Sequence, residues 1–144
     1  MSRLLSFIQM IFTEIGRGIS RLIGGFDGLI YALLIFVALN YVAGLMYAVM
    51  DRKISREIIF KGIFLKVLIF FLVVASNILD VEVIKNGSVL RTVVIFFYIG
   101  SEGISLLKNA RRLGLPIPVK MLDILEQLHN KSGERNEADG VGTD

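Results

Sequence analysis

The chemically informative residues of this chain are polar side chains inside otherwise apolar segments. Arg91, Tyr98, Glu102, Ser105 and Asn109 follow one another at helical spacing, so they would form one polar stripe on a single helix. Polar groups are costly inside a bilayer, so such a stripe indicates a specific contact. Two roles fit it: lining a water-filled path between several subunits, or hydrogen bonding between packed helices.

Two other apolar segments carry shorter stripes of the same kind. One combines a polar residue with small residues spaced by four, which lets a second helix approach closely. The other places a basic, an amide and an acidic side chain on a shared helix face. These stripes are Asn40, Gly44 and Ala48 in the first segment, and Lys66, Asn77 and Asp80 in the second.

The depths of the charged residues predict two ion pairs. The second and third segments must be antiparallel if both cross a membrane. Lys66 and Glu102 would then lie about one helical turn from the same end, and Asp80 and Arg91 would lie near the opposite end. We therefore expect the pairs Lys66–Glu102 and Asp80–Arg91, within one subunit or between subunits.

Three long apolar runs must position these residues. The chain has 144 residues, of which 54% are hydrophobic and 20% charged. Each run approaches the roughly 20 residues that a membrane helix needs. Buried helices of a soluble bundle are the alternative, but so short a chain has little polar surface to cover three of them. The predicted spans are residues 29–50, 62–79 and 89–107, within a membrane region of residues 26–110.

Both ends of the chain differ from this region. Polar residues, several of them arginines, recur at helical spacing through residues 1–23. This pattern predicts an amphipathic helix that either lies at the membrane interface or packs on the bundle. We assign residues 1–25 to this N-terminal unit. Residues 111–144 are expected to hold a connector with Pro116 and Pro118, a short amphipathic helix over 119–130 and a disordered tail. The predicted fold is therefore an all-α membrane protein.

Composition argues against several classes of function. The chain has no Cys and a single His, which disfavours thiolate chemistry, metal centres and most hydrolytic triads. The carboxylates are scattered, and basic residues are not interleaved with exposed aromatic residues. We therefore expect no enzyme activity, no cofactor, no metal and no binding of nucleic acid.

The distribution of basic residues predicts the orientation. With three spans, seven basic residues near the 51–61 loop and the 108–112 exit lie on one side, against four on the other. Cytoplasmic segments are enriched in Lys and Arg. The N-terminus is therefore expected outside and the C-terminus in the cytoplasm. If residues 1–23 crossed the membrane as a fourth span, the N-terminus would lie inside and the rest would stay as predicted.

Several short motifs, in order, resemble a known family. The run from Tyr98 to Asn109, YIGSEGISLLKN, is followed by Gly114-Leu115-Pro116-Ile117-Pro118 and a Leu-rich helix. Upstream, GGFD leads into the first span from Gly24, and RKIS follows it from Arg52. This pattern, from about Gly24 to Leu128, resembles the phage-lysis and toxin-secretion holins of Gram-positive bacteria and their phages. The chain departs from that family's usual residues at Asn40, Ser101 and Lys108.

The resemblance implies a function that composition does not supply. Such holins accumulate in the cytoplasmic membrane, form homo-oligomers and open large lesions through which an endolysin or a large toxin crosses. Two other classes also fit a small multi-pass chain. One is a channel subunit for small solutes, and the other is a non-lytic scaffold that docks a partner through its C-terminal helix.

Overall fold

The computed structural model contains helices and no strand over the residues that it describes, which are residues 1–141 for the backbone and 1–131 for side chains. This confirms the predicted all-α class. The elements in chain order are α1 (Ser2–Ile23), α2 (Gly28–Met50), α3 (Arg56–Ile78), the π-helix η1 (Leu79–Ile84), α4 (Val89–Arg112) and α5 (Val119–Val141).

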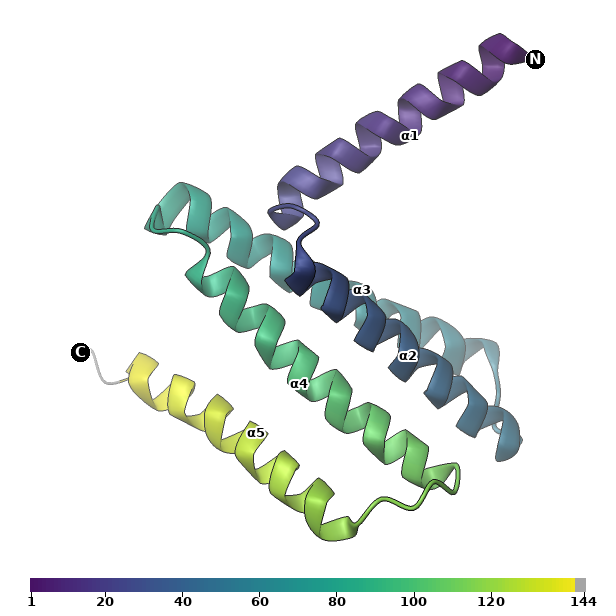
Figure 1. Cartoon of the computed structure of the whole chain (residues 1–144), viewed down its shortest axis with the longest axis vertical. Coiled ribbons are helices and arrows are strands. Elements are labelled where there is room, and N and C mark those ends of the chain that lie inside the picture. The colour runs from purple at the N-terminus through teal and green to yellow at the C-terminus, as the bar shows by residue number, and fades with distance from the viewer. Residues whose placement is uncertain (142–144) are drawn as a thin grey trace.

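Helices α2, α3 and α4 form a bundle in which α3 runs antiparallel to α2 and α4, and α4 lies between α2 and α5 in Figure 1. The pair α2 and α4 has the most extensive contact. A narrow apolar core joins these helices to the last turn of α1. Its buried residues are Ile23, Ile30, Leu33, Val37, Ile69, Val73 and Ile95.

The outward faces of the bundle are as apolar as its core. Phe64, Phe71 and Phe96 are 66%, 61% and 59% exposed. Within the described residues, three helical stretches are long and apolar enough to cross a membrane: Gly28–Met50, Arg56–Ile84 and Val89–Arg112. Apolar surfaces of this kind match the hydrocarbon of a bilayer. The chain is therefore a multi-pass membrane protein.

The helices differ in extent from the predicted spans 62–79 and 89–107. Helix α3 begins earlier, because the Ser55 hydroxyl oxygen accepts a hydrogen bond from the Ile58 N–H at 3.3 Å and caps the first turn. Its apolar pattern ends at Leu79, but the backbone continues as η1 to Ile84. Helix α4 extends past Leu107 to Arg112 with its polar last turns.

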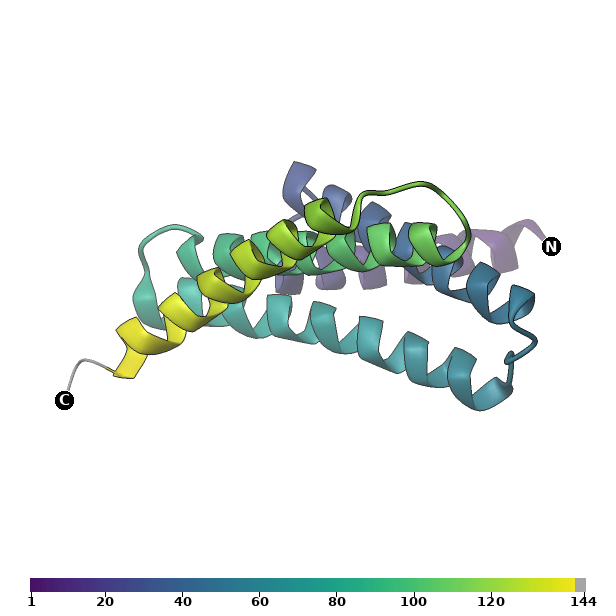
Figure 2. The same cartoon turned by 90° about the horizontal axis from the view of Figure 1, so that it is seen from below.

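The C-terminal helix also differs from its prediction. Helix α5 folds back beside α4 (Figures 1 and 2) and continues to Val141, beyond the expected end at Asn130. Residues 131–141 hold no Pro, and five of these eleven residues (two Glu and one each of Lys, Arg and Ala) favour a helix. The helix therefore continues although the segment has no apolar pattern. Of the predicted tail, residues 142–144 lie outside the described residues.

The turn between α1 and α2 depends on two glycines. Gly24 (φ 91°) and Gly25 (φ 97°) adopt left-handed backbone conformations that glycine accepts without strain. A Cβ atom on Gly24 would lie 2.5 Å from Asn77 Oδ1 and 2.7 Å from Arg91 Nε, whereas one on Gly25 would meet nothing within 4 Å. Gly24 therefore allows the close approach of α3 and α4 to this turn.

Substitution of the two glycines should separate backbone strain from steric contact. Gly24→Ala and Gly25→Ala each place a Cβ at positive φ, which costs about 1–2 kcal/mol. Gly24→Ala also displaces the Asn77 and Arg91 side chains, so we expect it to destabilise the protein by at least about 1 kcal/mol more. Unfolding in mixed detergent micelles, followed by circular dichroism, measures this difference. Equal destabilisation by both variants would contradict the close approach.

Candidate functional site

Four polar side chains from three helices meet inside the bundle, and we call them the glutamate cluster: Asn40, Lys66, Glu102 and Asn109. The Lys66 ammonium donates to both Glu102 carboxylate oxygens, at 2.6 and 2.8 Å. The Asn40 amide donates to Glu102 Oε2 at 2.6 Å and accepts from Asn109 Nδ2 at 2.8 Å. The carboxylate is thus the acceptor to which α2 and α3 are both joined.

Burial gives this cluster its energetic importance. Glu102 is 4% exposed and Asn40 is 6% exposed. The Lys66 side chain is 24% exposed, so its stem lies in apolar surroundings while its head pairs with Glu102. A buried carboxylate without partners would be strongly unfavourable, whereas hydrogen bonding and a counter-charge compensate for its burial. Across residues 1–131, every buried side-chain nitrogen and oxygen has a hydrogen-bond partner.

The predicted Lys66–Glu102 ion pair is confirmed, and it forms within one chain.

The small-residue stripe of α2 lies against α4 of the same chain. A Cβ on Gly44 would lie 3.7 Å from Asn109 Nδ2, and Ala48 is buried. On α4, Ser105 and Tyr98 are half-buried, and the Tyr98 ring packs edge-on against Phe97 with centroids 5.2 Å apart. The stripes thus face one another inside a single subunit.

A second cluster lies at the opposite end of the bundle, and we call it the arginine cluster. The Arg91 guanidinium donates to Asp27 at 2.9 and 3.2 Å, and to the backbone carbonyls of Ile23 at 2.6 Å and Gly25 at 3.0 Å. Arg91 is 2% exposed. One side chain of α4 therefore fixes the end of α1, the following turn and the start of α2.

The predicted Asp80–Arg91 ion pair is wrong in its partners. Asp80 is 1% exposed, and its carboxylate accepts hydrogen bonds from the backbone N–H groups of Leu90 at 3.0 Å and Arg91 at 2.8 Å. It therefore satisfies free donors in the first turn of α4, where the helix dipole favours negative charge. The Arg91 side chain pairs with Asp27 instead.

Sequence reasoning placed a break at Gly24-Gly25 but did not assign Asp27 or the carbonyls beside it as partners of Arg91. Asp27 precedes the first span, at the depth where Arg91 begins the third, so depth alone offered Arg91 two acidic partners. Asn77 was predicted as an interface residue, and it donates to the Leu22 carbonyl at 2.9 Å. A backbone carbonyl leaves no mark in a sequence pattern. Only the neighbouring pair Gly24-Gly25 signals that the chain turns tightly here.

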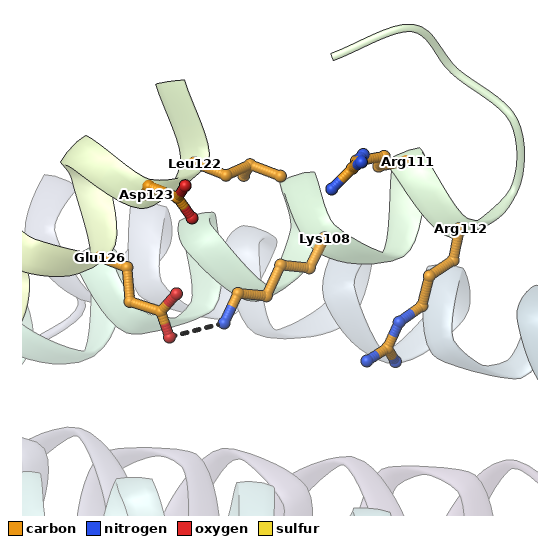
Figure 3. A pocket seen from close by; sticks show the side chains of 6 residues that line it. All are labelled: Lys108, Arg111, Arg112, Leu122, Asp123 and Glu126. Atoms are coloured by element: carbon orange, nitrogen blue, oxygen red, sulfur yellow. Dashed lines mark hydrogen bonds and ion pairs between the residues drawn. The ribbon is translucent and has the colours of Figure 1, made fainter. Parts of the chain in front are cut away.

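A third set of contacts joins α4 to α5. The Lys108 ammonium donates to Glu126 at 2.7 Å, and the Phe97 and His129 rings stack with centroids 4.4 Å apart. Figure 3 shows the Lys108–Glu126 pair among the side chains that line a cleft between α4 and α5. The volume of this cleft is about 440 Å³. The cleft is lined by Lys108, Arg111, Arg112, Leu122, Asp123 and Glu126. Both partners of this ion pair remain partly exposed, so the pair contributes little to stability.

The charge of Asp27 depends on the arginine cluster. The hydrogen bond from the Arg91 guanidinium lowers the pKa of Asp27 below its ordinary value of 3.8, against a smaller opposing effect of burial. The Ile30 N–H also donates to this carboxylate at 3.1 Å, which caps α2 and lowers the pKa further. Asp27 is therefore ionised at neutral pH and carries the counter-charge for Arg91.

Exchange of the charges in the glutamate cluster should test its pairing. Lys66→Glu places a second carboxylate beside Glu102, and we expect destabilisation on the order of 3 kcal/mol or more. The double variant Lys66→Glu, Glu102→Lys restores opposite charges and should recover most of this loss. Unfolding in mixed micelles provides the measurement.

The exposed pair between α4 and α5 supplies the matched control. Lys108→Met removes the ion pair with Glu126 and should change the free energy of unfolding by no more than about 1 kcal/mol. A double charge exchange at positions 66 and 102 that stays as unstable as Lys66→Glu would count against the buried pair.

The lowered pKa of Asp27 predicts a dependence of stability on pH. A carboxylate with a depressed folded pKa stabilises the folded state above its unfolded pKa, and this contribution is lost as the pH falls through the folded value. The difference in melting temperature between the unmodified protein and Asp27→Asn should thus be largest above about pH 5 and shrink as the solution is acidified. A difference that stays constant from pH 7 to pH 2 would contradict the role of Asp27.

Comparison with known proteins places these clusters in a family context. The chain is 33% identical over 132 residues to an uncharacterized 14.9 kDa protein in the nagH 3' region of Clostridium perfringens, covering 91% of this chain and 99% of that one. It is 33% identical to the uncharacterized protein Lmo0128 of Listeria monocytogenes, over 81% of this chain and 82% of the relative. No solved structure matches the chain.

A family model gives the most direct assignment. The model described as the bacteriophage holin family matches residues 17–130. The match contains α2, α3 and α4 with both polar clusters, the last turns of α1 and the beginning of α5. The chain belongs to the bacteriophage holin family.

Proposed function

We propose that the chain is a holin that oligomerises in the cytoplasmic membrane and opens lesions large enough for an endolysin or a large toxin to cross. The family membership and the three membrane-spanning helices support this proposal. The observation that carries the mechanism is the glutamate cluster, which keeps charged groups inside one subunit beneath an apolar exterior. No substrate turnover is involved.

A single subunit with this arrangement is compatible with a sealed membrane. The buried polar side-chain atoms among residues 1–131 are satisfied internally, and its outer faces are apolar. Such a molecule can accumulate in lipid without exposing charge to hydrocarbon. Because three packed helices enclose only a narrow core, a path that admits a folded enzyme must be built from several copies.

The same polar groups can line the open lesion. If α4 separates from α2 and α3, water can solvate Glu102, Lys66 and Asn40 in place of their present partners. The stripes would then act as contacts between helices in the closed subunit and as lining in the open assembly. A charge that crosses the whole membrane field changes in energy by about 2.3 kcal/mol per 100 mV, so an opening that carried Glu102 and Lys66 to different depths would depend on the potential. Loss of the membrane potential would thereby shift the balance between the two states.

The distribution of charge favours an orientation with the C-terminus in the cytoplasm. The end of α2, the start of α3 and the end of α4 lie at one end of the bundle (Figure 1). This end carries Arg52, Lys53, Lys108, Arg111 and Arg112 among its residues. The enrichment of basic residues on cytoplasmic segments supports the proposed orientation.

Inducible expression in bacterial cells tests the proposal. Cells would be compared with and without a cytoplasmic wall-degrading enzyme that lacks an export signal, while turbidity and membrane potential are followed together. We expect abrupt lysis only when the enzyme is present, because the lesion must admit a folded protein. The Lys66→Glu variant should alter the onset of lysis, and the double charge exchange should restore it.

The other outcomes would identify other functions. Loss of membrane potential without release of the enzyme would contradict the holin proposal and indicate a narrow channel. An unchanged potential at good membrane expression would also contradict it and leave a scaffold that docks a partner through α5.

A further inference from the structure

Helix α1 presents a long apolar face that no other helix covers. Leu4, Phe7, Phe12 and Ile15 are between 53% and 70% exposed, and only the last residue, Ile23, is buried. The apolar residues lie on one side of the helix and the polar residues on the other. Such a face requires an apolar partner.

The arginine cluster fixes the depth of α1 relative to the spans. Arg91 holds the carbonyls of Ile23 and Gly25, and Asn77 holds that of Leu22. These contacts lie where α2 begins, α3 passes into η1 and α4 begins. The C-terminal end of α1 is therefore held at the level at which three helices enter or leave the membrane.

The direction of α1 completes the placement. Figure 1 shows α1 leaving the bundle at a steep angle to α2 and α4, with the N-terminus far from them. Because α2, α3 and α4 cross the membrane, a helix that starts at their ends and runs across their direction follows the membrane surface. Its 22 residues would extend about 33 Å along that surface.

The charges of α1 agree with a surface location and with anionic lipid. The helix carries Arg3, Arg17 and Arg21 against one acidic residue, Glu14. Glu14 and Arg17 would lie deep in the hydrocarbon if α1 crossed the bilayer, at a high cost. At the surface, the arginines can instead contact the phosphates of phospholipids while the apolar face enters the acyl boundary.

We propose that α1 is a lipid-binding helix that lies in the headgroup region of the bilayer, on the side where α2 begins, and that it prefers anionic phospholipids. Arg91 acts as a positioning residue, since it joins this surface helix to the spanning helix α4. The proposal does not depend on whether the assembled protein opens a lesion.

Spin labels on the full-length chain test the placement. The chain has no Cys, so single cysteines can be introduced without background. Leu4→Cys, Ile11→Cys and Ile15→Cys report on the apolar face, and Ser6→Cys and Thr13→Cys are the matched polar-face controls. Each protein would be reconstituted in nanodiscs containing phosphatidylglycerol, and label accessibility to oxygen and to a water-soluble nickel complex would be measured.

A surface helix gives a periodic result. The three apolar-face labels should show a similar shallow depth and high oxygen accessibility, and the two polar-face labels should be accessible to nickel. If α1 crossed the bilayer, the depths at positions 4 and 15 would differ by about 16 Å, which would overturn the proposal. Low accessibility of the apolar-face labels to both reagents would also overturn it, because a second copy of the chain would then cover that face.

The lipid preference is tested in the same system. In one arm, the nanodiscs contain phosphatidylcholine alone. In the other, the nanodiscs are anionic and the protein carries the substitutions Arg3→Gln, Arg17→Gln and Arg21→Gln. Each change should raise the nickel accessibility of the label at position 11 at least twofold. An unchanged accessibility in both arms would overturn the preference for anionic lipid.

Discussion

The Glu102 carboxylate imposes the constraint on which the bundle depends. A negative charge at this depth is tolerated only if its partners reach it from neighbouring helices. Lys66 of α3 and Asn40 of α2 provide those contacts, and Asn109, two turns further along the same face of α4, donates to Asn40. Apolar helices slide and rotate against one another at small cost, whereas this acceptor has one arrangement that satisfies it. The cluster therefore sets the relative rotation and depth of the three spans.

The arginine cluster performs the complementary task at the other end. A cation, two carboxylates and several backbone groups are matched there, so that Arg91 and Asp80 carry little unsatisfied polarity despite their burial. The two clusters use different means. The glutamate cluster joins side chains to side chains, and the arginine cluster mainly joins side chains to backbone atoms at helix ends. The apolar core that includes Ile30, Val73 and Ile95 packs the helices together as well.

The sequence was sufficient wherever a physical rule acts on residue type. Span length and hydropathy predicted the helices, and depth along antiparallel helices predicted the Lys66–Glu102 pair. Depth alone could not identify the acidic partner of Arg91, because Asp27 and Asp80 lie at a similar level. Asp80 instead accepts hydrogen bonds from the free N–H groups in the first turn of α4, which leaves Asp27 to pair with Arg91. The extension of α5 was missed because helix propensity acts without an apolar pattern. Carbonyl acceptors were missed because every residue has one.

The use of backbone carbonyls as acceptors affects which substitutions the protein can tolerate. The hydrogen bonds that attach α1 use the carbonyl oxygens of Leu22, Ile23 and Gly25, so these bonds place little demand on side chains, although the Ile23 side chain also packs in the core. The demand falls on Gly24, whose missing side chain leaves room for Arg91. The family match begins at residue 17, inside α1. The turn therefore accepts other side chains at the residues that offer only their carbonyls, but it has no room for a side chain at Gly24.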